Sequence, residues 1–183
     1  MITLSVNQTA AALGVLEAAW PLDPVGQLPA GLQRLLADGL VTRGGALLLA
    51  ADPNPPEVTF AELPTEQQAV YHDLTGWECF VNELHLDEHL QGADAANGLD
   101  LDAQRAVLVC GLAATLVLHQ HARQLPVPPS IRCITATNAS GATFRFHQIR
   151  PGEQWLDGDL DNYTNEALLV IDWQPPRNVQ SLR

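Results

Sequence analysis

The chain contains no lysine, so its basic side chains are nine arginines, and its 21 acidic residues give a formal net charge of −12. Without lysine, the chain cannot form a Schiff base with a substrate or with pyridoxal phosphate, and it has no phosphate-loop or kinase-type lysine. The negative charge argues against binding to nucleic acid or to an anionic membrane, because both require a basic surface.

Cysteine, signal-peptide features and long apolar runs are also scarce. Cys79, Cys110 and Cys133 are odd in number and far apart, which predicts free thiols in a reducing compartment and hence a cytoplasmic protein. No charged residue precedes the apolar N-terminal stretch, so we expect no signal peptide. The longest apolar run, Ala106 to Leu118, is too short to span a bilayer and predicts a buried helix.

The acidic residues are concentrated in one part of the chain. Between Arg43 and Arg105 the only basic residues are histidines, and this stretch holds twelve acidic residues. The remaining parts carry nine acidic residues and nine arginines, so the net charge lies in the middle third. A carboxylate-rich surface attracts a positively charged protein over a long range. The pattern therefore favours a basic protein partner.

Hydrophobic periodicity predicts an α+β fold in a single domain spanning residues 1–183, with a loose tail at 174–183. We expect a C-terminal antiparallel β-meander packed against a long buried helix, with further helices in the N-terminal and middle parts. The long helix should begin at Asp100 or Asp102 and end near Leu125, before three prolines. The other predicted elements are strands at Ile2–Val6, Ala46–Ala50, Val58–Phe60, Ile131–Asn138, Ala142–Ile149 and Ala167–Trp173, and helices at Thr9–Trp20, Pro29–Asp38 and Thr65–Leu74.

The leading functional hypothesis is an acidic binding module of the immunity-protein or inhibitor type, which presents residues 52–102 to a basic partner. Aromatic residues interleaved with the acids would anchor the interface. The predicted binding residues are Tyr71, Asp73, Trp77, Glu78, Glu83, Asp87 and Glu88. No motif fixes a reaction, so the sequence favours a protein that is not an enzyme and needs no cofactor. A structural or assembly subunit without catalytic activity is a further alternative.

The alternative with catalytic chemistry rests on the segment His85-Leu86-Asp87-Glu88-His89, which resembles the inverted zinc-protease signature H-x-x-E-H. On a helix, His85 and His89 share one face and can bind one zinc ion. The resemblance implies that Glu88 is the general base and that Glu166 is the third ligand of a small zinc-dependent hydrolase. This requires residues 75–90 to be helical, as the spacing of their apolar residues favours, although alternation in 80–86 also fits a strand.

Two further patterns concern the C-terminal half. Phe144 and Phe146 alternate with Arg145 and His147, which predicts a strand with one buried aromatic face and one polar face that is either a ligand surface or simply hydrated. The segment Asp157-Gly158-Asp159-Leu160-Asp161 is similar to the start of an EF-hand calcium loop. The loop lacks its glycine and its bidentate glutamate, which predicts a turn-rich surface loop rather than a complete calcium site.

Overall fold

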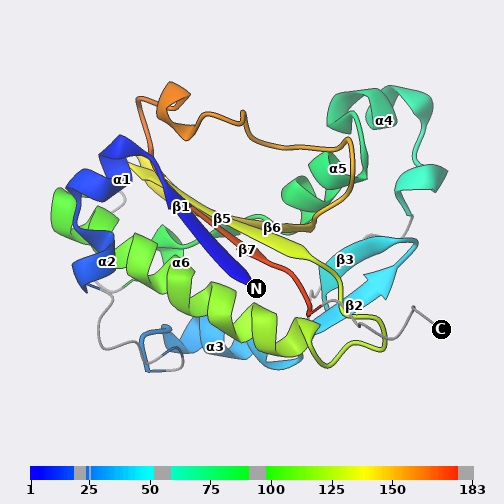
Figure 1. Ribbon diagram of the computed structural model, residues 1–183, viewed down its shortest axis with the longest axis horizontal. Coiled ribbons are helices and arrows are strands. Elements are labelled where there is room, and N and C mark those ends of the chain that lie inside the picture. The colour runs from blue at the N-terminus through cyan, green and yellow to red at the C-terminus, as the bar shows by residue number, and fades with distance from the viewer. Residues whose placement is uncertain (19–23, 25, 52–58, 91–97, 177–183) are drawn as a thin grey trace.

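The computed structural model describes residues 1–18, 24, 26–51, 59–90 and 98–176, and its centre is a five-stranded antiparallel sheet (Figure 1). The strand order is β1-β7-β5-β6-β4. The strands are β1 (Ile2–Val6), β4 (Leu84–His85), β5 (Ile131–Asn138), β6 (Gly141–Gln148) and β7 (Ala167–Trp173). Helices and a large antiparallel sheet together confirm the predicted α+β class.

The three C-terminal strands lie where alternation predicted them, but their order differs from that of a simple meander. Strands β5 and β6 form a hairpin, and β7 pairs with β5 instead of β6. A short turn after β6 would have placed β7 at the side of β6. The intervening segment, residues 149–166, is long enough to cross the sheet and bring β7 to the far side of β5 (Figure 1).

The long helix α6 (Leu101–Ala122) covers one face of this sheet and packs mainly on β5 and β7. It begins as expected, because the Asp100 side chain accepts a hydrogen bond of 2.8 Å from the N–H of Ala103. By length and composition α6 could cross a membrane, yet 56% of its most apolar window is buried inside the protein. That burial is typical of the core helix of a soluble domain.

Shorter elements surround this centre. A second sheet is formed by β2 (Leu40–Arg43), which the sequence analysis missed, and β3 (Ala46–Leu49). The short helices are α1 (Gln8–Ala12), α2 (Val15–Ala18), α3 (Ala30–Ala37), α4 (Thr65–Tyr71) and α5 (Leu74–Val81), with 3₁₀ turns η1 (Phe60–Glu62), η2 (Asp87–His89) and η3 (Leu160–Asn162). The helix predicted at 9–20 is interrupted at Gly14, whose φ is +63°.

Two predictions in the middle of the chain are wrong. Phe60 starts a 3₁₀ turn rather than ending a strand, and Thr59 and Glu62 form a capping box for this turn. Residues 75–90 are helical only as far as Val81, because the Asn82 side chain donates to the carbonyl oxygens of β3 Leu47 (2.8 Å) and β6 Phe146 (3.1 Å). Residues 52–58 and 91–97 of the predicted acidic interface, and most of the predicted tail, lie outside the described residues.

His119 of α6 is a buried histidine with an expected effect on stability. Only 2% of it is exposed, and its ring lies 5.9 Å from that of Trp173. Neither ring nitrogen has a hydrogen-bond partner among the residues that the structure describes. Burial, and then the charge of Arg123, lower its pKa from 6.5 to about 4. The unfolded chain therefore binds more protons than the folded protein between these two pH values.

We expect the free energy of unfolding to fall as the pH drops from 6.5 to 4, with His119 accounting for up to about 3 kcal/mol of the loss. The variant His119→Phe keeps a ring beside Trp173 and removes the titration. Urea unfolding at a series of pH values should show a shallower acid dependence for the variant. Parallel curves for the two proteins would show that His119 does not titrate in this way.

Candidate functional site

The candidate site is the face of the five-stranded sheet that points away from α6, which we call the outer face. Phe144 and Phe146 of β6 are fully buried in the core. Arg145 and His147 alternate with them and so point to the outer face, as the sequence pattern predicted. The long segment 150–166 runs across this side of the sheet (Figure 1). The outer face therefore carries polar side chains and is partly covered.

A row of polar side chains crosses the outer face. The register places Asp172 of β7, Arg132 of β5 and His147 of β6 opposite one another. The Arg132 guanidinium forms a bidentate ion pair with Asp172, with two N–O distances of 2.7 Å. His147 is 2% exposed, its Nδ1 lies 2.9 Å from the carbonyl oxygen of Gln148, and burial lowers its pKa. Its Nε2 has no hydrogen-bond partner within the described part of the chain.

A second row begins at Arg145. Its guanidinium lies 2.8 Å from Glu83 Oε2 and also donates to Thr143 Oγ1 at 2.8 Å. The same guanidinium lies 6.0 Å from the centre of the Trp155 ring. Trp155 is nevertheless 42% exposed. Arg145 thus lies beside a large aromatic side chain at the surface of segment 150–166.

Segment 150–166 is attached to the sheet by a small apolar cluster. Leu156 packs with Ile134 and Val170 of the sheet, and Leu160 and Tyr163 pack against the same cluster. A hollow of about 480 Å³ remains between the segment and the sheet. Its polar lining comes from Ser5, Arg132, Gln154, Asp157, Asp159, Asp161 and Asp172. Negative side chains therefore outnumber positive ones in this hollow.

The three aspartates of the segment form consecutive turns, as turn-forming residues should. Asp157 accepts from the N–H of Asp159 (3.0 Å), Asp159 from that of Asp161 (3.1 Å), and Asp161 from that of Gln8 (2.8 Å). The hydrogen bond from Asp159, followed by one from Asn162, lowers the pKa of Asp157. All three aspartates are exposed, so they contribute negative charge to the surface.

The residues proposed for zinc do not form a common site. His85 lies in β4 and lines a hollow of about 320 Å³ together with Glu166. The ring of His89 packs instead beside Gly31 of α3, where an added Cβ would lie 2.8 Å from Nδ1. Glu88 is exposed on η2. Within the part of the chain that the structure describes, no group of three histidine, cysteine, aspartate or glutamate side chains is arranged to hold a metal ion.

The three cysteines are free and buried, in agreement with the predicted free thiols. Burial raises the pKa of Cys79 and of Cys133 to about 12 and that of Cys110 to about 11. A thiol with such a high pKa is almost entirely protonated at neutral pH, whereas nucleophilic attack requires the thiolate. None of the three has the environment of a catalytic nucleophile.

Within the described residues 59–90, the predicted binding residues of the acidic interface do not form one exposed surface. Trp77 is 4% exposed and packs in the core, and Glu78 is fully buried. The other side chains have intramolecular partners: Asp73 caps α5, Glu83 pairs with Arg145, Asp87 accepts from the N–H of Ala142, and the Tyr71 ring lies 5.1 Å from that of Phe80. Trp77 and Glu78 are thus corrected from interface residues to core residues, while Glu88 remains exposed.

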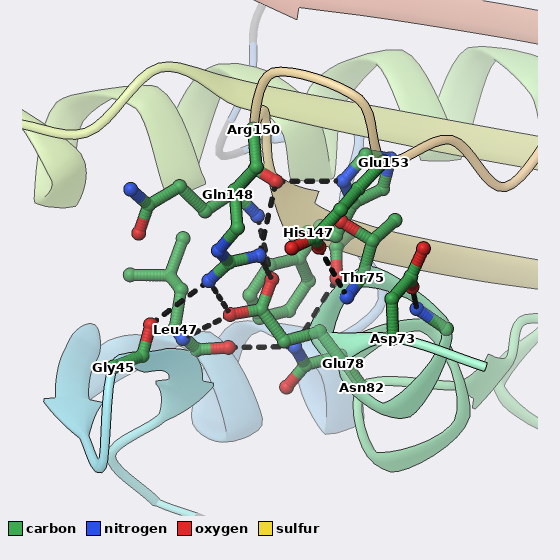
Figure 2. A network of polar contacts seen from close by, with 12 residues as sticks. Gly45, Leu47, Asp73, Thr75, Glu78, Asn82, His147, Gln148, Arg150 and Glu153 are labelled. Carbon is green, nitrogen blue, oxygen red and sulfur yellow. Dashed lines mark hydrogen bonds and ion pairs between the residues drawn. The ribbon is translucent and has the colours of Figure 1, made fainter. Parts of the chain in front are cut away.

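Glu78 is the centre of a buried polar network that the sequence analysis missed (Figure 2). Its Oε1 accepts from the N–H of Leu47 and from Arg150 Nη2, each at 2.6 Å. Its Oε2 accepts from the N–H of Gln148 at 2.7 Å and from Arg150 Nη1 at 3.0 Å. Burial raises the pKa of Glu78, and Arg150 acts in the opposite direction. The network joins β3, α5, β6 and the start of segment 150–166.

The comparisons with known proteins give a family but no characterised relative. No curated protein and no solved structure shows a significant match to the chain. A family model matches residues 22–181, which include the outer face apart from β1, the segment above it and the Glu78 network. By this match the chain belongs to the Uncharacterized protein PM0498 family.

Proposed function

We propose that this protein is a cytoplasmic binding module of the immunity-protein or inhibitor type, which holds a basic protein through the outer face. The contact surface is segment 150–166, with the exposed Trp155 at its centre and the aspartates 157, 159 and 161 beside it. This moves the proposed interface from the acidic middle third of the sequence to a C-terminal segment. Glu83 contributes indirectly, because it pairs with the arginine that supports Trp155.

The observation that carries the proposal is the pairing of the arginines under this surface. Arg132, Arg145 and Arg150 each form an ion pair, with Asp172, Glu83 and Glu78 respectively. Their positive charge is therefore compensated within the fold. The three exposed aspartates have no cationic side chain among their hydrogen-bond partners in the described residues. The segment therefore offers negative charge to a partner.

Trp155 supplies the apolar part of the surface. Tryptophan is enriched among the interface residues that dominate binding energy, particularly where neighbouring groups hold the ring rigidly. The guanidinium of Arg145 beside the Trp155 ring provides this rigidity. A ring that is already oriented loses little conformational freedom when a partner covers it.

The charge part of the proposal is tested by changing Asp157, Asp159 and Asp161 together to asparagine. Asparagine keeps an oxygen acceptor for each turn, so the segment should retain its shape while losing three charges. Affinity capture from the native host should identify a basic protein, and its association rate with the triple variant should fall on the order of tenfold at low salt. High salt should remove most of the difference.

A matched control removes three charges elsewhere: Glu17→Gln, Asp38→Asn and Glu66→Gln, all at exposed positions. This control should bind the partner as the unmodified protein does. Trp155→Ala should raise the Kd of the complex about 30-fold, as expected for a hot spot. Equal effects of the two triple variants would show that only net charge matters. Unchanged affinity of Trp155→Ala would remove segment 150–166 as the interface.

A further inference from the structure

The outer edge of β1 carries backbone groups that have no hydrogen-bond partner among the described residues. Strand β1 lies at one edge of the sheet, and its strand partner among the described residues is β7 (Figure 1). Hydrogen bonds from Gln174 N to Met1 O and from Asn7 N to Leu168 O show that the odd-numbered residues bond to β7. In an antiparallel pair the bonding direction alternates along the strand. The N–H and C=O groups of Ile2, Leu4 and Val6 therefore point to the open edge.

This edge lacks the features that usually prevent strand-to-strand association. Natural edge strands are protected by charged side chains, proline or bulges. No ionisable side chain occurs between Met1 and Leu16, although the chain carries a net charge of −12. The side chains of Ile2 and Leu4 are 49% and 37% exposed. Depletion of charge together with exposed apolar side chains is typical of the centre of a protein interface.

The sequence of β1 also reads almost the same in both directions about Leu4. Ile2 and Val6 are both β-branched and apolar, and Thr3 and Ser5 are both small hydroxyl residues. An antiparallel pairing of β1 with itself, centred on Leu4, therefore places like residues opposite one another. A two-fold axis requires this kind of self-complementarity.

We propose that two copies of this chain associate through β1, with Leu4 opposite Leu4 of the second copy, to give one continuous ten-stranded sheet. Leu4 would exchange two backbone hydrogen bonds with its counterpart. Ile2 would exchange two with Val6 of the second copy, and Val6 two with its Ile2. The apolar side chains of both β1 strands lie on the α6 side of the sheet, because Leu4 is opposite Ile171 and Val6 opposite Leu169 of the core. They would cover one another there.

The test is the mass of the full-length protein across a concentration series. Sedimentation equilibrium should show a mass rising from 19.8 kDa to twice that value between micromolar and millimolar concentrations. High salt should strengthen the dimer, since each copy carries the same charge of −12. Leu4→Lys places two like charges opposite each other and should raise the dimer Kd at least about tenfold. Val70→Lys, at a 71% exposed position on α4, is the matched control and should not change the Kd.

Amide hydrogen exchange of the unmodified protein tests the register independently of any variant. The amides of Ile2, Leu4 and Val6 should exchange more slowly as the concentration rises. The amides of Thr3 and Ser5, which bond to β7, should be protected at every concentration. A protein that stays monomeric at millimolar concentration would overturn the proposal. So would a dimer that survives Leu4→Lys unchanged or leaves the three outward amides unprotected.

Discussion

The variant Glu78→Ala is expected to lower the free energy of unfolding by about 3–5 kcal/mol, the usual result of removing one partner of a buried ion pair. The loss leaves the Arg150 guanidinium, 14% exposed, without its carboxylate. It also leaves the N–H groups of Leu47 and Gln148 without their acceptor. A buried donor without an acceptor is costly because it was removed from water without compensation. Urea unfolding followed by circular dichroism measures the effect.

Two controls separate burial from charge in this experiment. Glu83→Ala breaks the ion pair with Arg145, in which the Glu83 side chain is 26% exposed and the Arg145 side chain 20% exposed. This variant should lower the free energy of unfolding by no more than about 1 kcal/mol. The double variant Glu78→Met with Arg150→Met replaces both charges by apolar groups and should recover much of the lost stability. Equal losses for Glu78→Ala and Glu83→Ala would contradict the assigned role of Glu78.

The Glu78 network also shows why charge counted along the sequence does not give the charge of a surface. Glu78 lies in an arginine-free stretch, yet Arg150 pairs with it from 72 positions away. Arg145 reaches Glu83 across 62 positions in the same way. A linear count treats these carboxylates as uncompensated, because nothing local in the sequence records a partner supplied by the fold. The location of acidic residues in a sequence is thus a poor guide to the charge of a surface.

Alternation of apolar residues and helix-capping residues predicted the elements that these local features determine. Strand β7 and strand β5 have the predicted bounds, and α6 begins at its predicted cap. Residues 75–90 have apolar residues at helical spacing, which predicts a longer helix. The helix ends at Asn82, where side-chain bonds to two distant carbonyl groups hold the chain. Those bonds are tertiary contacts, which periodicity along the chain cannot register.

For the same reason, the sequence predicted which side chains of β6 point to the outer face but not what surrounds them. Alternation in β6 correctly separated Phe144 and Phe146 from Arg145 and His147. It did not indicate that His147 would be buried or that Trp155 would be placed beside Arg145. Both depend on tertiary contacts, because α5 packs on β6 and because segment 150–166, which carries Trp155, has no regular periodicity. An isolated tryptophan among turn-forming residues was the signal available in the sequence.

A glycine in the middle of α6 sets how closely the long helix approaches the sheet. A Cβ atom added at Gly111 would meet the side chain of Thr135 on β5, lying 2.7 Å from its Cγ2 and 2.8 Å from its Cβ. Thr135 is 1% exposed and belongs to a central strand, so it has no free space into which to move. Glycine normally weakens a helix, and its presence here is explained by this contact.

We therefore expect Gly111→Val to lower the free energy of unfolding by about 3 kcal/mol or more, because a branched side chain at this contact must push α6 away from β5. Thr135→Ala in the same chain should restore part of the loss, and a double-mutant cycle in urea measures the coupling between the two positions. Gly31→Val in α3 is the control. The added side chain would contact the ring of the half-buried His89, which can rotate outward. The free energy of unfolding should therefore fall by no more than about 1 kcal/mol. Additive effects of the two changes at Gly111 and Thr135 would mean that α6 is not held against β5 at this point.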